Sequence, residues 1–437
     1  MIVMKFGGSS VANAARIRNI ASIVKRKKRE CPVVVVSALG GVTDGLLQAA
    51  NEAARGRNPK NVLAEIIRKH YAAIDALSLR REIIGDEVEQ LGRRLESMSM
   101  LGECTPKGVD LLVSFGERMS ARIIAAHLSN TGMPAKAYDA YDIGMITDSN
   151  FGNADVLPQS YPRMRRKLAK LAHVPVITGF IGKDRAGNVT TLGRGGSDYT
   201  ASIIGAAIGA KEIQIWTDVN GIMTADPRVV RGAKSIAVVS YGEASELAVL
   251  GAKVLHPKTI LPAMDKGIPV RILNTFNPGH KGTVVLRNPG VKCRIASITC
   301  KKNIQVMNLS TPSMFQEHGF LRKVFGVFES RGVSVDMVST SEVNVSVAIE
   351  GRHITDALKS ELGKIAKVDV RSGRAKISLV GNDLIYVRGA LGRMFSALKG
   401  MSIEMVSSSL SETNQSFVVK EKDADTAVRR LHATFFG

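Results

Sequence analysis

The chain has 437 residues, of which 45% are apolar and 23% are charged, and its formal net charge is +21. This composition is that of an ordinary globular protein and excludes a disordered or fibrous chain, while the length allows two or three domains. Uncharged apolar runs such as 199–210 are too short to span a bilayer. Basic residues are spread along the chain, with clusters only at 25–29 and 163–170. We therefore expect neither a membrane nor a nucleic-acid partner.

The cysteines and the N-terminal residues indicate the compartment. Cys31, Cys104, Cys293 and Cys300 form no CxxC pair, which in a chain of this length indicates reduced thiols. Lys5 and the pair Gly7-Gly8 stand within the first eight residues, so the sequence shows no apolar signal-peptide region there. We expect a cytoplasmic protein.

In the first 275 residues, short apolar runs alternate with helical patterns. The runs are typical of strands buried on both faces. They lie at 2–6, 33–37, 174–178, 213–216 and 270–273. Helical patterns lie at 14–27, 117–128 and 199–209, and residues 55–104 are helical in pattern almost throughout. This alternation predicts an α/β fold, with a mostly parallel sheet that is covered by helices on both faces.

Two Asn-Pro-Gly turns, at 277–279 and 288–290, mark a domain boundary, after which the order of elements becomes βαββαβ. The first pass has strands at 304–309, 333–338, 343–349 and 368–370 and helices at 319–330 and 354–365. The second pass has strands at 376–380, 402–406 and 416–419 and helices at 384–398 and 423–435.

The second pass lacks its last strand, and an unassigned strand at 294–300 precedes the first pass. We infer that this strand completes the second unit, so that the first unit is inserted in the second. The predicted domains are residues 1–290, an inserted unit at 303–372, and a second unit made of 293–301 and 374–437.

A glycine-bearing segment, KFGGSSV at 5–11, follows the first strand and precedes a helix. Its glycines would let backbone N–H groups approach an anion, the helix N-terminus adds positive potential, and Lys5 can neutralise phosphate charge. A tight turn between strand and helix is the simpler explanation. Neither GxxxxGK[ST] nor GxGxxG is present, which excludes a P-loop and a Rossmann dinucleotide site.

Two further segments carry candidate chemistry. In TLGRGGSD at 191–198, Arg194 stands among glycines, where its guanidinium can reach a carboxylate, and Asp198 either acts at the site or caps the next helix. WTDVNG at 216–221, with DPR at 226–228, follows a buried strand. Open α/β sheets bind ligands at such strand ends, although an Asn-Gly turn would also explain the sequence.

In this order the segments resemble the amino-acid kinase family and, within it, the aspartokinases. SFGE at 114–117, GFIG at 179–182 and GAKVLHP at 251–257 extend the resemblance, which covers essentially the whole chain. The tail resembles the paired ACT regulatory domains of this family, in which one ACT unit is inserted in the other. GFL at 319–321 with SEV at 341–343 resembles the monofunctional, lysine-sensitive branch.

The resemblance implies ATP-dependent phosphorylation of the side-chain carboxylate of L-aspartate to 4-phospho-L-aspartate, the first step towards lysine (through diaminopimelate), threonine and methionine. This carboxylate is ionised at pH 7, so its attack on the γ-phosphorus needs no general base. Catalysis is then positioning and charge neutralisation. The resemblance also implies Mg²⁺ held largely by phosphates and water, feedback inhibition by lysine, and a homodimer through the ACT domains, with a tetramer left open.

The resemblance also implies roles for individual residues. Lys5 would stabilise the transferring phosphoryl group, and Asp198 would orient Lys5. The implied aspartate-binding residues are Thr43, Glu117 (on the α-ammonium), Arg194 (on the α-carboxylate) and Ser197. The implied nucleotide-binding residues are Lys5, Gly7, Gly8, Ser9, Thr217, Asp218, Met223, Arg228, Lys253 and Val254. The implied lysine-binding residues are Met314, Gln316, Glu317, Gly319, Phe320, Leu321, Val335, Asp336, Ser341 and Glu342.

Two residues depart from the family pattern. Met223 stands where a tyrosine is usual, and it can pack on a base but offers no hydroxyl. Glu317 replaces a small residue, and the sequence does not give the sign of its effect. Trp216 is expected in the core rather than against the nucleotide.

Two alternative functions stay open beside the aspartokinase. One is a kinase for another carboxylate, such as glutamate or N-acetylglutamate, although such relatives usually lack the paired ACT tail. The other is an amino-acid sensor with an inactive kinase domain. The presence of all four candidate site residues argues against a sensor: Lys5, Glu117, Arg194 and Asp198.

Overall fold

The structure, a computed structural model, divides into two compact units, each of which is described by itself. It describes residues 1–437 except 251–254, 256, 292, 313, 315–317 and 409–412. The first unit comprises Met1–Ile222, Ala237–Tyr241 and Val254–Pro289. The second comprises Met223–Ile236, Gly242–Lys253 and Gly290–Gly437. Two segments from the region before residue 290 therefore belong to the second unit, and the domain bounds given above stay a prediction.

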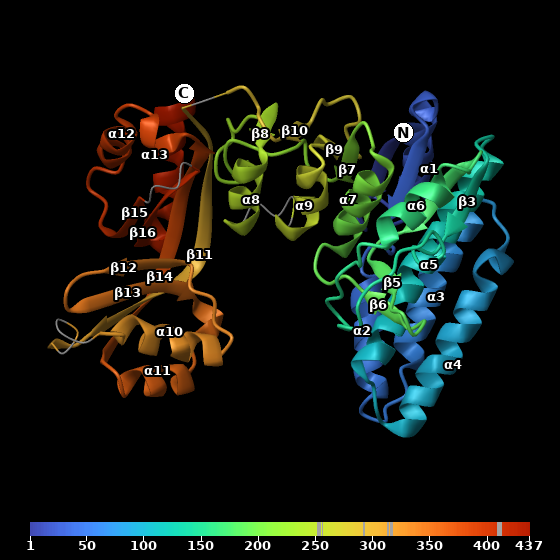
Figure 1. Cartoon of the computed structure of the whole chain (residues 1–437), viewed down its shortest axis with the longest axis horizontal. Helices are drawn as coiled ribbons and strands as arrows, with labels where there is room; N and C mark the ends of the chain where they lie inside the picture. Colours follow the sequence, from blue (N-terminus) through green and yellow to red (C-terminus); the bar gives the residue numbers. More distant parts are fainter. Residues whose placement is uncertain (251–254, 256, 292, 313, 315–317, 409–412) are drawn as a thin grey trace. The chain divides into compact units, whose positions relative to one another are not determined.

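A mostly parallel eight-stranded sheet forms the centre of the first unit, as predicted (Figure 1). Its order is β3-β4-β2-β1-β7-β9-β10-β8, and only the β9–β10 pair is antiparallel. The strands are β1 (Ile2–Phe6), β2 (Pro32–Val36), β3 (Ala135–Tyr138), β4 (Val174–Thr178), β7 (Ile213–Thr217), β8 (Val238–Ser240), β9 (Val270–Asn274) and β10 (Thr283–Leu286). A separate hairpin pairs β5 (Ile181–Lys183) with β6 (Val189–Thr191).

The apolar runs of the sequence predict the central strands but not β3, β8 and β10 of this sheet. These strands have only three or four residues each, and β3 is partly exposed, so their apolar runs are too short to distinguish a strand from a loop.

Helices surround this sheet, and Figure 1 shows the long helices α3 and α4 beside α5. Helices α3 and α4 confirm the helical excursion predicted for residues 55–104. The helices are α1 (Ala14–Arg26), α2 (Val42–Ala53), α3 (Lys60–Ala76), α4 (Gly85–Leu101), α5 (Pro106–Asn130), α6 (Ser160–Leu168), α7 (Gly196–Ile208) and α9 (Pro257–Asp265). A further helix, α8 (Tyr241–Val249), lies almost entirely in the second unit.

Helix α5 is much longer than the helix predicted at 117–128. It begins at Pro106, immediately after an N-cap at Thr105. The Thr105 side chain accepts a hydrogen bond from the Gly108 N–H at 3.2 Å, and Pro106 occupies the first helical position. Both features favour a helix start. This early part of α5 carries Asp110, whose carboxylate accepts hydrogen bonds from Thr191 of β6.

Strand β1 is buried on both faces, and alternation along the strand divides its side chains between them. Ile2, Met4 and Phe6 belong to the apolar core that also contains residues of α1 and α5. Val3 and Lys5 therefore point to the opposite face, where α7 contacts β1. A lysine thus lies at the end of a fully buried strand, on the face that carries Asp198.

A single six-stranded antiparallel sheet forms the second unit, in the order β12-β13-β11-β14-β16-β15. Its strands are β11 (Arg294–Ser310), β12 (Met337–Thr340), β13 (Asn344–Glu350), β14 (Lys367–Asn382), β15 (Ile403–Ser408) and β16 (Asn414–Lys420). Its helices are α8, α10 (Phe320–Ser330), α11 (Asp356–Gly363), α12 (Ala390–Ala397) and α13 (Ala424–Phe436).

Three of the strand boundaries predicted in this unit are wrong. The strands predicted at 294–300 and 304–309 are one continuous strand, β11, and those at 368–370 and 376–380 are one strand, β14. The strand predicted at 333–338 begins only at Met337, because Gly332 and Val333 donate to carbonyls of α10 and close that helix.

Three apolar clusters hold the second unit together. One lies beneath α10 and α11, and a second lies beneath α12 and α13. The second cluster also contains Ala225 and Val230, which explains why 223–236 belongs to this unit. A small third cluster joins residues of β11, β12, β13, β15 and β16, including Met337 and Met405, and the two edge strands β12 and β15 contact each other.

Candidate active site

The carboxyl ends of β1, β7 and β9 converge at one edge of the first unit's sheet. The Gly7 N–H donates to the Trp216 carbonyl at 3.3 Å, and the Ser10 hydroxyl lies 2.7 Å from the Thr275 hydroxyl. The Thr275 N–H donates to the Thr217 carbonyl at 2.8 Å. These contacts fix the loops that follow three neighbouring strands, at the edge where open α/β sheets bind ligands.

The loop after β1 also lies against the loop after β2. A Cβ atom on Gly8 would lie 3.2 Å from the Ala38 carbonyl oxygen, and one on Gly40 would lie 3.3 Å from the Gly8 carbonyl oxygen. The two loops therefore approach with almost no room for side chains. Ser9 is exposed beside them, and Thr43 is half-buried in the first turn of α2.

Lys5 forms an ion pair with Asp198, at 2.6 Å between Nζ and Oδ1. Lys5 is only 9% exposed, and Asp198 lies in the first turn of α7. The N-cap of α7 is Gly195, so Asp198 is not the helix cap that the sequence left open. The structure thus brings together two charged residues from sequence segments nearly two hundred positions apart.

Glu117, on α5, is a buried carboxylate with little compensation. It is 3% exposed, and Oε1 accepts a hydrogen bond from the Ala38 N–H at 3.1 Å. Its other oxygen, Oε2, has no hydrogen-bond partner among the described residues. Burial raises the pKa of Glu117 to about 8, against the opposing effect of the Ala38 hydrogen bond. An unpaired buried oxygen of this kind suits an incoming ammonium group.

Arg194 and Ser197 flank the start of α7. Arg194 is exposed between Gly193 and Gly195, which have φ angles of +74° and +73° that glycine adopts readily. Ser197 is buried, and a Cβ atom on Gly179 would lie 2.6 Å from its hydroxyl oxygen. The loop after β4 therefore packs directly on Ser197.

The predicted nucleotide-binding residues are divided between the two units. Thr217 and Asp218 follow β7, and the Thr217 hydroxyl donates to Asp218 at 3.2 Å. Met223 and Arg228 belong to the second unit, where Arg228 is exposed and pairs with Asp226 at 2.6 Å. Lys253 and Val254 lie outside the described residues.

Trp216 is a core residue, as predicted. It is buried, stacks on Phe6 with 5.9 Å between ring centroids, and donates from Nε1 to Gln214 at 3.1 Å.

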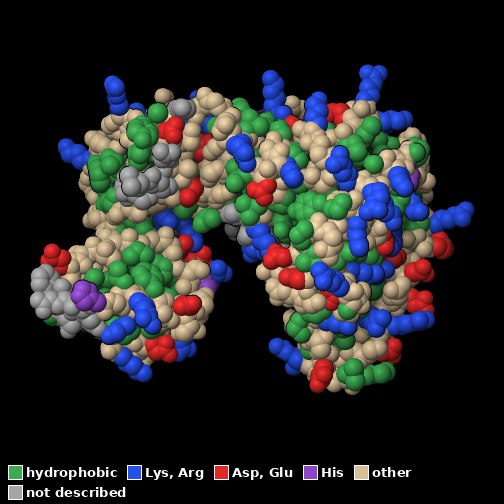
Figure 2. Space-filling view, in the orientation of Figure 1, with side chains coloured by type: hydrophobic (Ala, Val, Ile, Leu, Met, Phe, Trp, Pro, Cys, Tyr) green, Lys and Arg blue, Asp and Glu red, His purple; other side chains and the backbone are tan. Residues whose placement is uncertain are grey.

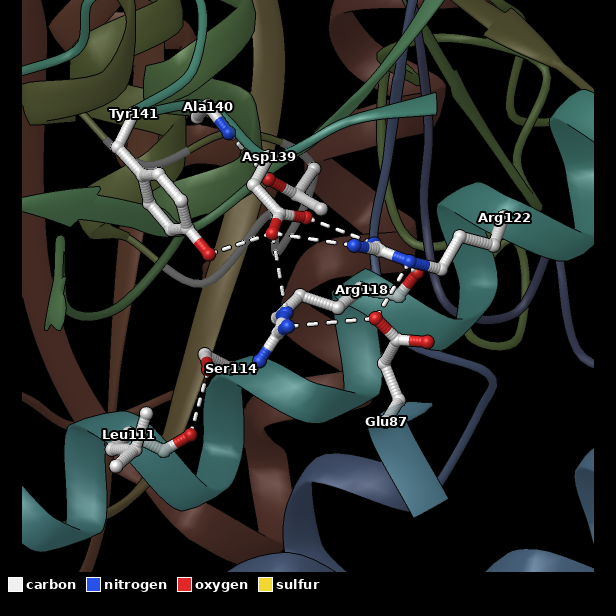
Figure 3. Close-up of polar contacts among 9 residues, drawn as sticks. Glu87, Leu111, Ser114, Arg118, Arg122, Asp139, Ala140 and Tyr141 are labelled. Atoms are coloured by element: carbon white, nitrogen blue, oxygen red, sulfur yellow. Dashed lines mark hydrogen bonds and ion pairs between the residues drawn. The ribbon is translucent and has the colours of Figure 1, made fainter. Parts of the chain in front are cut away.

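A buried ion network anchors α5 beside the site (Figure 3). Asp139 pairs with Arg122 at 2.9 Å and with Arg118 at 3.2 Å, and it accepts a hydrogen bond from Tyr141 at 2.6 Å. Glu87, from α4, pairs with Arg122 at 2.7 Å. Burial alone would raise the pKa of Asp139, but the two arginines and the Tyr141 hydroxyl hold it below its usual value. The network fixes the middle of α5 between α4 and the segment after β3.

The predicted lysine-binding residues lie in the second unit. Gly319 is the N-cap of α10. Phe320 is buried in the cluster beneath that helix, where the partly buried Met314 and Val335 also pack. The Thr311 N–H donates to the Val343 carbonyl at 3.2 Å, which brings the segment after β11 to the β12–β13 turn. Leu321, Ser341 and Glu342 are exposed. Gln316 and Glu317 lie outside the described residues.

Asp336 already has a cationic partner within the second unit. Lys301 Nζ lies 2.7 Å from Asp336 Oδ1 and 2.8 Å from Glu350 Oε1. Lys376 also donates to the Asp336 carbonyl at 3.0 Å. Glu342, by contrast, makes no ion pair with any residue that the structure describes.

Several residues of the first unit's site were not identified from the sequence. Ser10, Ala38, Gly40 and Thr275 take part in its backbone and hydroxyl contacts. Each stands within a few residues of a strand's carboxyl end, and this placement is the signal that could have found them.

Among the described residues, no group of three or more His, Cys, Asp or Glu side chains is arranged to hold a metal ion. None of the helices in the described part of the chain combines the length and apolar character that crossing a membrane requires.

Comparison with known families matches both parts of the chain. The model of the amino acid kinase family matches residues 1–274, and that of an ACT domain matches 308–360 and 377–435.

Whole proteins match over the same range. Aspartokinase 1 of Arabidopsis thaliana, a chloroplastic protein, is 41% identical over 99% of this chain and 80% of its own length. Lysine-sensitive aspartokinase 3 of Escherichia coli is 35% identical over 100% of this chain and 99% of its own length. Crystal structures of E. coli aspartokinase III match over 100% of both chains. The complex with aspartate and ADP has a TM-score of 0.82 and 33% identity, and the complex with lysine and aspartate has a TM-score of 0.84 and 34% identity.

Glu117→Gln tests the buried carboxyl directly. With a pKa of about 8 when folded and 4.5 when unfolded, the wild-type carboxyl takes up a proton on folding. Its contribution to stability is therefore present below pH 4.5 and lost as pH rises towards 8, by up to about 1.4 kcal/mol per pH unit. Chemical denaturation at pH 5, 6, 7 and 8 should show the free energy of unfolding of wild type falling relative to that of the variant. An unchanged difference would contradict the buried, neutral carboxyl.

Proposed function

This chain belongs to the amino acid kinase family and, within it, to the aspartokinases, and we propose that it transfers the γ-phosphoryl group of ATP to the side-chain carboxylate of L-aspartate. The observation that carries the proposal is the buried Lys5–Asp198 ion pair at the strand ends, in the unit that also holds the unpaired carboxylate of Glu117. A cation for the phosphoryl group, and a carboxyl group that an incoming ammonium would favour in its ionised form, are what this reaction requires. The product would be 4-phospho-L-aspartate, the first intermediate on the route to lysine, threonine and methionine.

The mechanism follows from how these charges are held. The attacking carboxylate is already ionised, so the protein must bring two anions together and neutralise the charge of the transition state. Lys5 would supply that charge, and Asp198 would keep its ammonium group at the end of β1. Glu117 would bind the α-ammonium through its free oxygen, and Arg194 the α-carboxylate, with Thr43 and Ser197 beside them. Gly7, Gly8 and Ser9 would cradle the phosphates.

The nucleotide would extend along the loop after β7, over Thr217 and Asp218. Met223, Arg228, Lys253 and Val254 complete the proposed set by family resemblance. Mg²⁺ would be held largely by the phosphate oxygens of ATP and by water, which are the ligands that this ion retains most readily. When bound, it would neutralise part of the phosphate charge.

A coupled assay of ADP formation tests the proposed reaction. With ATP and Mg²⁺, we expect turnover with aspartate and at least a hundredfold lower kcat/KM with glutamate or N-acetylglutamate. Preference for another carboxylate would indicate a different kinase of the family, and no turnover with any of them would indicate an inactive sensor.

Lys5→Ala should lower kcat for aspartate phosphorylation by roughly two to four orders of magnitude, because it removes one electrostatic stabiliser of the transition state. The Kd for ATP, measured by calorimetry, should change far less. Lys25→Ala, on α1, is the matched control and should retain wild-type kcat. If Lys5→Ala keeps activity within tenfold of wild type, Lys5 has no part in the chemistry.

Arg194→Lys should raise the KM for aspartate about tenfold or more while the KM for ATP changes less than twofold. Lysine keeps the positive charge but loses the two-pronged geometry that matches a carboxylate. Initial-rate kinetics with each substrate varied in turn measure both constants. A rise in the KM for ATP alone would assign Arg194 to the nucleotide.

We further propose that lysine inhibits the enzyme by binding in the second unit, around the start of α10 and the β12–β13 turn. The α-carboxylate would face the N-terminus of α10 at Gly319, Phe320 and Leu321, where backbone N–H groups and the helix dipole favour an anion. Glu342 would take the ε-ammonium, since it is exposed and Asp336 is already paired with Lys301. Met314, Glu317, Val335 and Ser341 would line the remainder of the site.

Lysine titrations distinguish the two candidate carboxylates. Glu342→Gln should raise the lysine concentration for half-inhibition by about tenfold or more, roughly 1.4 kcal/mol. Lys301→Met should leave it nearly unchanged, with Lys302→Met as the matched neighbouring control. If Lys301→Met instead lowers that concentration, Asp336 is the carboxylate that binds lysine. If millimolar lysine leaves the wild-type enzyme untouched, the whole site is wrong.

We also propose a cytoplasmic homodimer formed through the ACT domains. The thiols of all four cysteines are free, as expected in a reducing compartment. Leu321 on α10, Val338 on β12 and Val343 in the β12–β13 turn are exposed apolar positions, which would suit a subunit contact. Figure 2 shows hydrophobic side chains at the surface of this part of the second unit. Light scattering of the pure protein measures the mass of the assembly, including a tetramer.

A further inference from the structure

Asp110, in the second turn of α5, is a buried carboxylate whose hydrogen-bond donors all lie outside its own helix. It is 2% exposed. Its Oδ2 accepts hydrogen bonds from the Thr191 N–H at 2.8 Å and the Gly152 N–H at 2.9 Å, and its Oδ1 accepts one from the Thr191 hydroxyl at 2.9 Å. Burial raises the pKa of Asp110, and these three donors oppose that rise. Burying a charge in this way is costly unless donors surround it.

The two segments that Asp110 holds lie directly against each other. The Ala154 N–H donates to the Thr191 carbonyl at 2.8 Å. A Cβ atom on Gly193 would lie 2.6 Å from the Asn153 side-chain oxygen and 3.2 Å from the Gly152 carbonyl oxygen. Residues 152–154 thus form a wall behind the Gly193 backbone, and one carboxylate ties that wall to the end of β6.

Arg194 directly follows Gly193, whose backbone packs against residues 152 and 153. Its side chain is exposed, and the glycines on either side would let the backbone take many conformations. The restraint on Arg194 therefore comes from the segments on either side. On its N-terminal side the restraint is the Thr191 anchor, three residues away, together with the wall behind Gly193.

The helix that carries Asp110 also carries Glu117, seven residues later. Seven residues are nearly two helical turns, so both side chains lie on similar faces, about 10 Å apart along the axis. The buried network at Arg118 and Arg122 fixes this helix immediately beyond Glu117 (Figure 3). One rigid helix therefore presents Glu117 and, through Asp110, holds the base of the loop that presents Arg194.

We propose that Asp110 is a positioning residue for the amino-acid substrate, which sets the place of Arg194 relative to Glu117 and so the spacing between the groups that receive the α-carboxylate and the α-ammonium. This inference rests on the roles of Arg194 and Glu117 in the proposed function. Asp110 itself would contact neither the substrate nor a phosphate group, and it would act only through the position of Arg194. Its effect is confined to the binding of the α-amino-acid end of aspartate.

The chemistry of the carboxylate supplies a conservative rescue. Asp110→Ala leaves the Thr191 N–H, the Thr191 hydroxyl and the Gly152 N–H without their acceptor. In Asp110→Asn, the amide oxygen can accept both N–H groups, while the amide nitrogen donates to the Thr191 hydroxyl, which can also accept. Thr191→Val removes the hydroxyl bond alone and nearly keeps the side-chain shape. Ser114→Ala, on the same helix, is the matched control, because its buried hydroxyl donates within α5, to the Leu111 carbonyl.

The experiment is a double-mutant cycle with the full chain, in which initial rates give KM for aspartate and for ATP. Asp110→Ala should raise the KM for aspartate ten- to a hundredfold with the KM for ATP within twofold. Asp110→Asn should return it to within about threefold of wild type, and Thr191→Val should raise it two- to fivefold. In the Arg194→Ala background, Asp110→Ala should have almost no further effect on the KM for aspartate, because the residue that it positions is gone.

Each alternative outcome has a separate meaning. Equal and additive effects of Asp110→Ala in both backgrounds would overturn the positioning role, as would parallel losses for aspartate and ATP. If Asp110→Ala does not fold by circular dichroism, the cycle of Thr191→Val with Arg194→Ala decides in its place, and additivity there overturns the proposal. A wild-type enzyme that phosphorylates no aspartate would contradict the proposed function itself rather than the role of Asp110.

Discussion

The ion pair between Lys5 and Asp198 is the contact on which the rest of the catalytic unit depends. An ammonium group that is almost completely buried is costly unless an opposite charge accompanies it, and the partner here comes from the start of α7. The fold must therefore bring the end of β1 and the first turn of α7 together before either residue is tolerable. The same arrangement leaves a cation that is fixed in place at a strand end and that can be shared with an anion brought in beside it.

Helix α5 shows how unevenly the unit compensates its buried charges. Asp110 on α5 has three donors, and Asp139 beside it has two arginines and a tyrosine hydroxyl, so both are fully supported. Glu117, which follows Asp110 on α5, accepts a hydrogen bond from one backbone N–H of another segment, that of Ala38. While Asp110 and Asp139 are surrounded by donors, one oxygen of Glu117 stays open where the amino-acid substrate is proposed to bind. Asp110 and Asp139 therefore hold α5 in place, whereas the incompletely bonded Glu117 is the candidate for a functional residue.

Much of this architecture could be predicted from the sequence, because buried parallel strands and glycine turns leave strong local patterns. The central strands β1, β4 and β7 and the helical excursion at α3 and α4 were predicted from apolar periodicity alone. The family-derived roles of Lys5, Glu117 and Arg194 remain predictions, although Lys5 and Asp198 do meet. What the sequence could not give are the contacts between distant segments. Neither Asp110 with Thr191 nor Lys301 with Asp336 leaves any local pattern, since each pair is made by the fold. The start of α5 was missed although its Thr-Pro cap was readable.

The two long strands of the second unit have a consequence for how it can move. β11 and β14 are hydrogen-bonded to each other from Arg294 opposite Asn382 to Ser310 opposite Lys367, with irregularities only near 295–297 and 301–306. No linker separates the two halves, so cutting the chain between them would break a sheet rather than a tether. The pair should melt and exchange its amide hydrogens as one cooperative body, and any free energy of ligand binding in one half becomes part of the stability of the other.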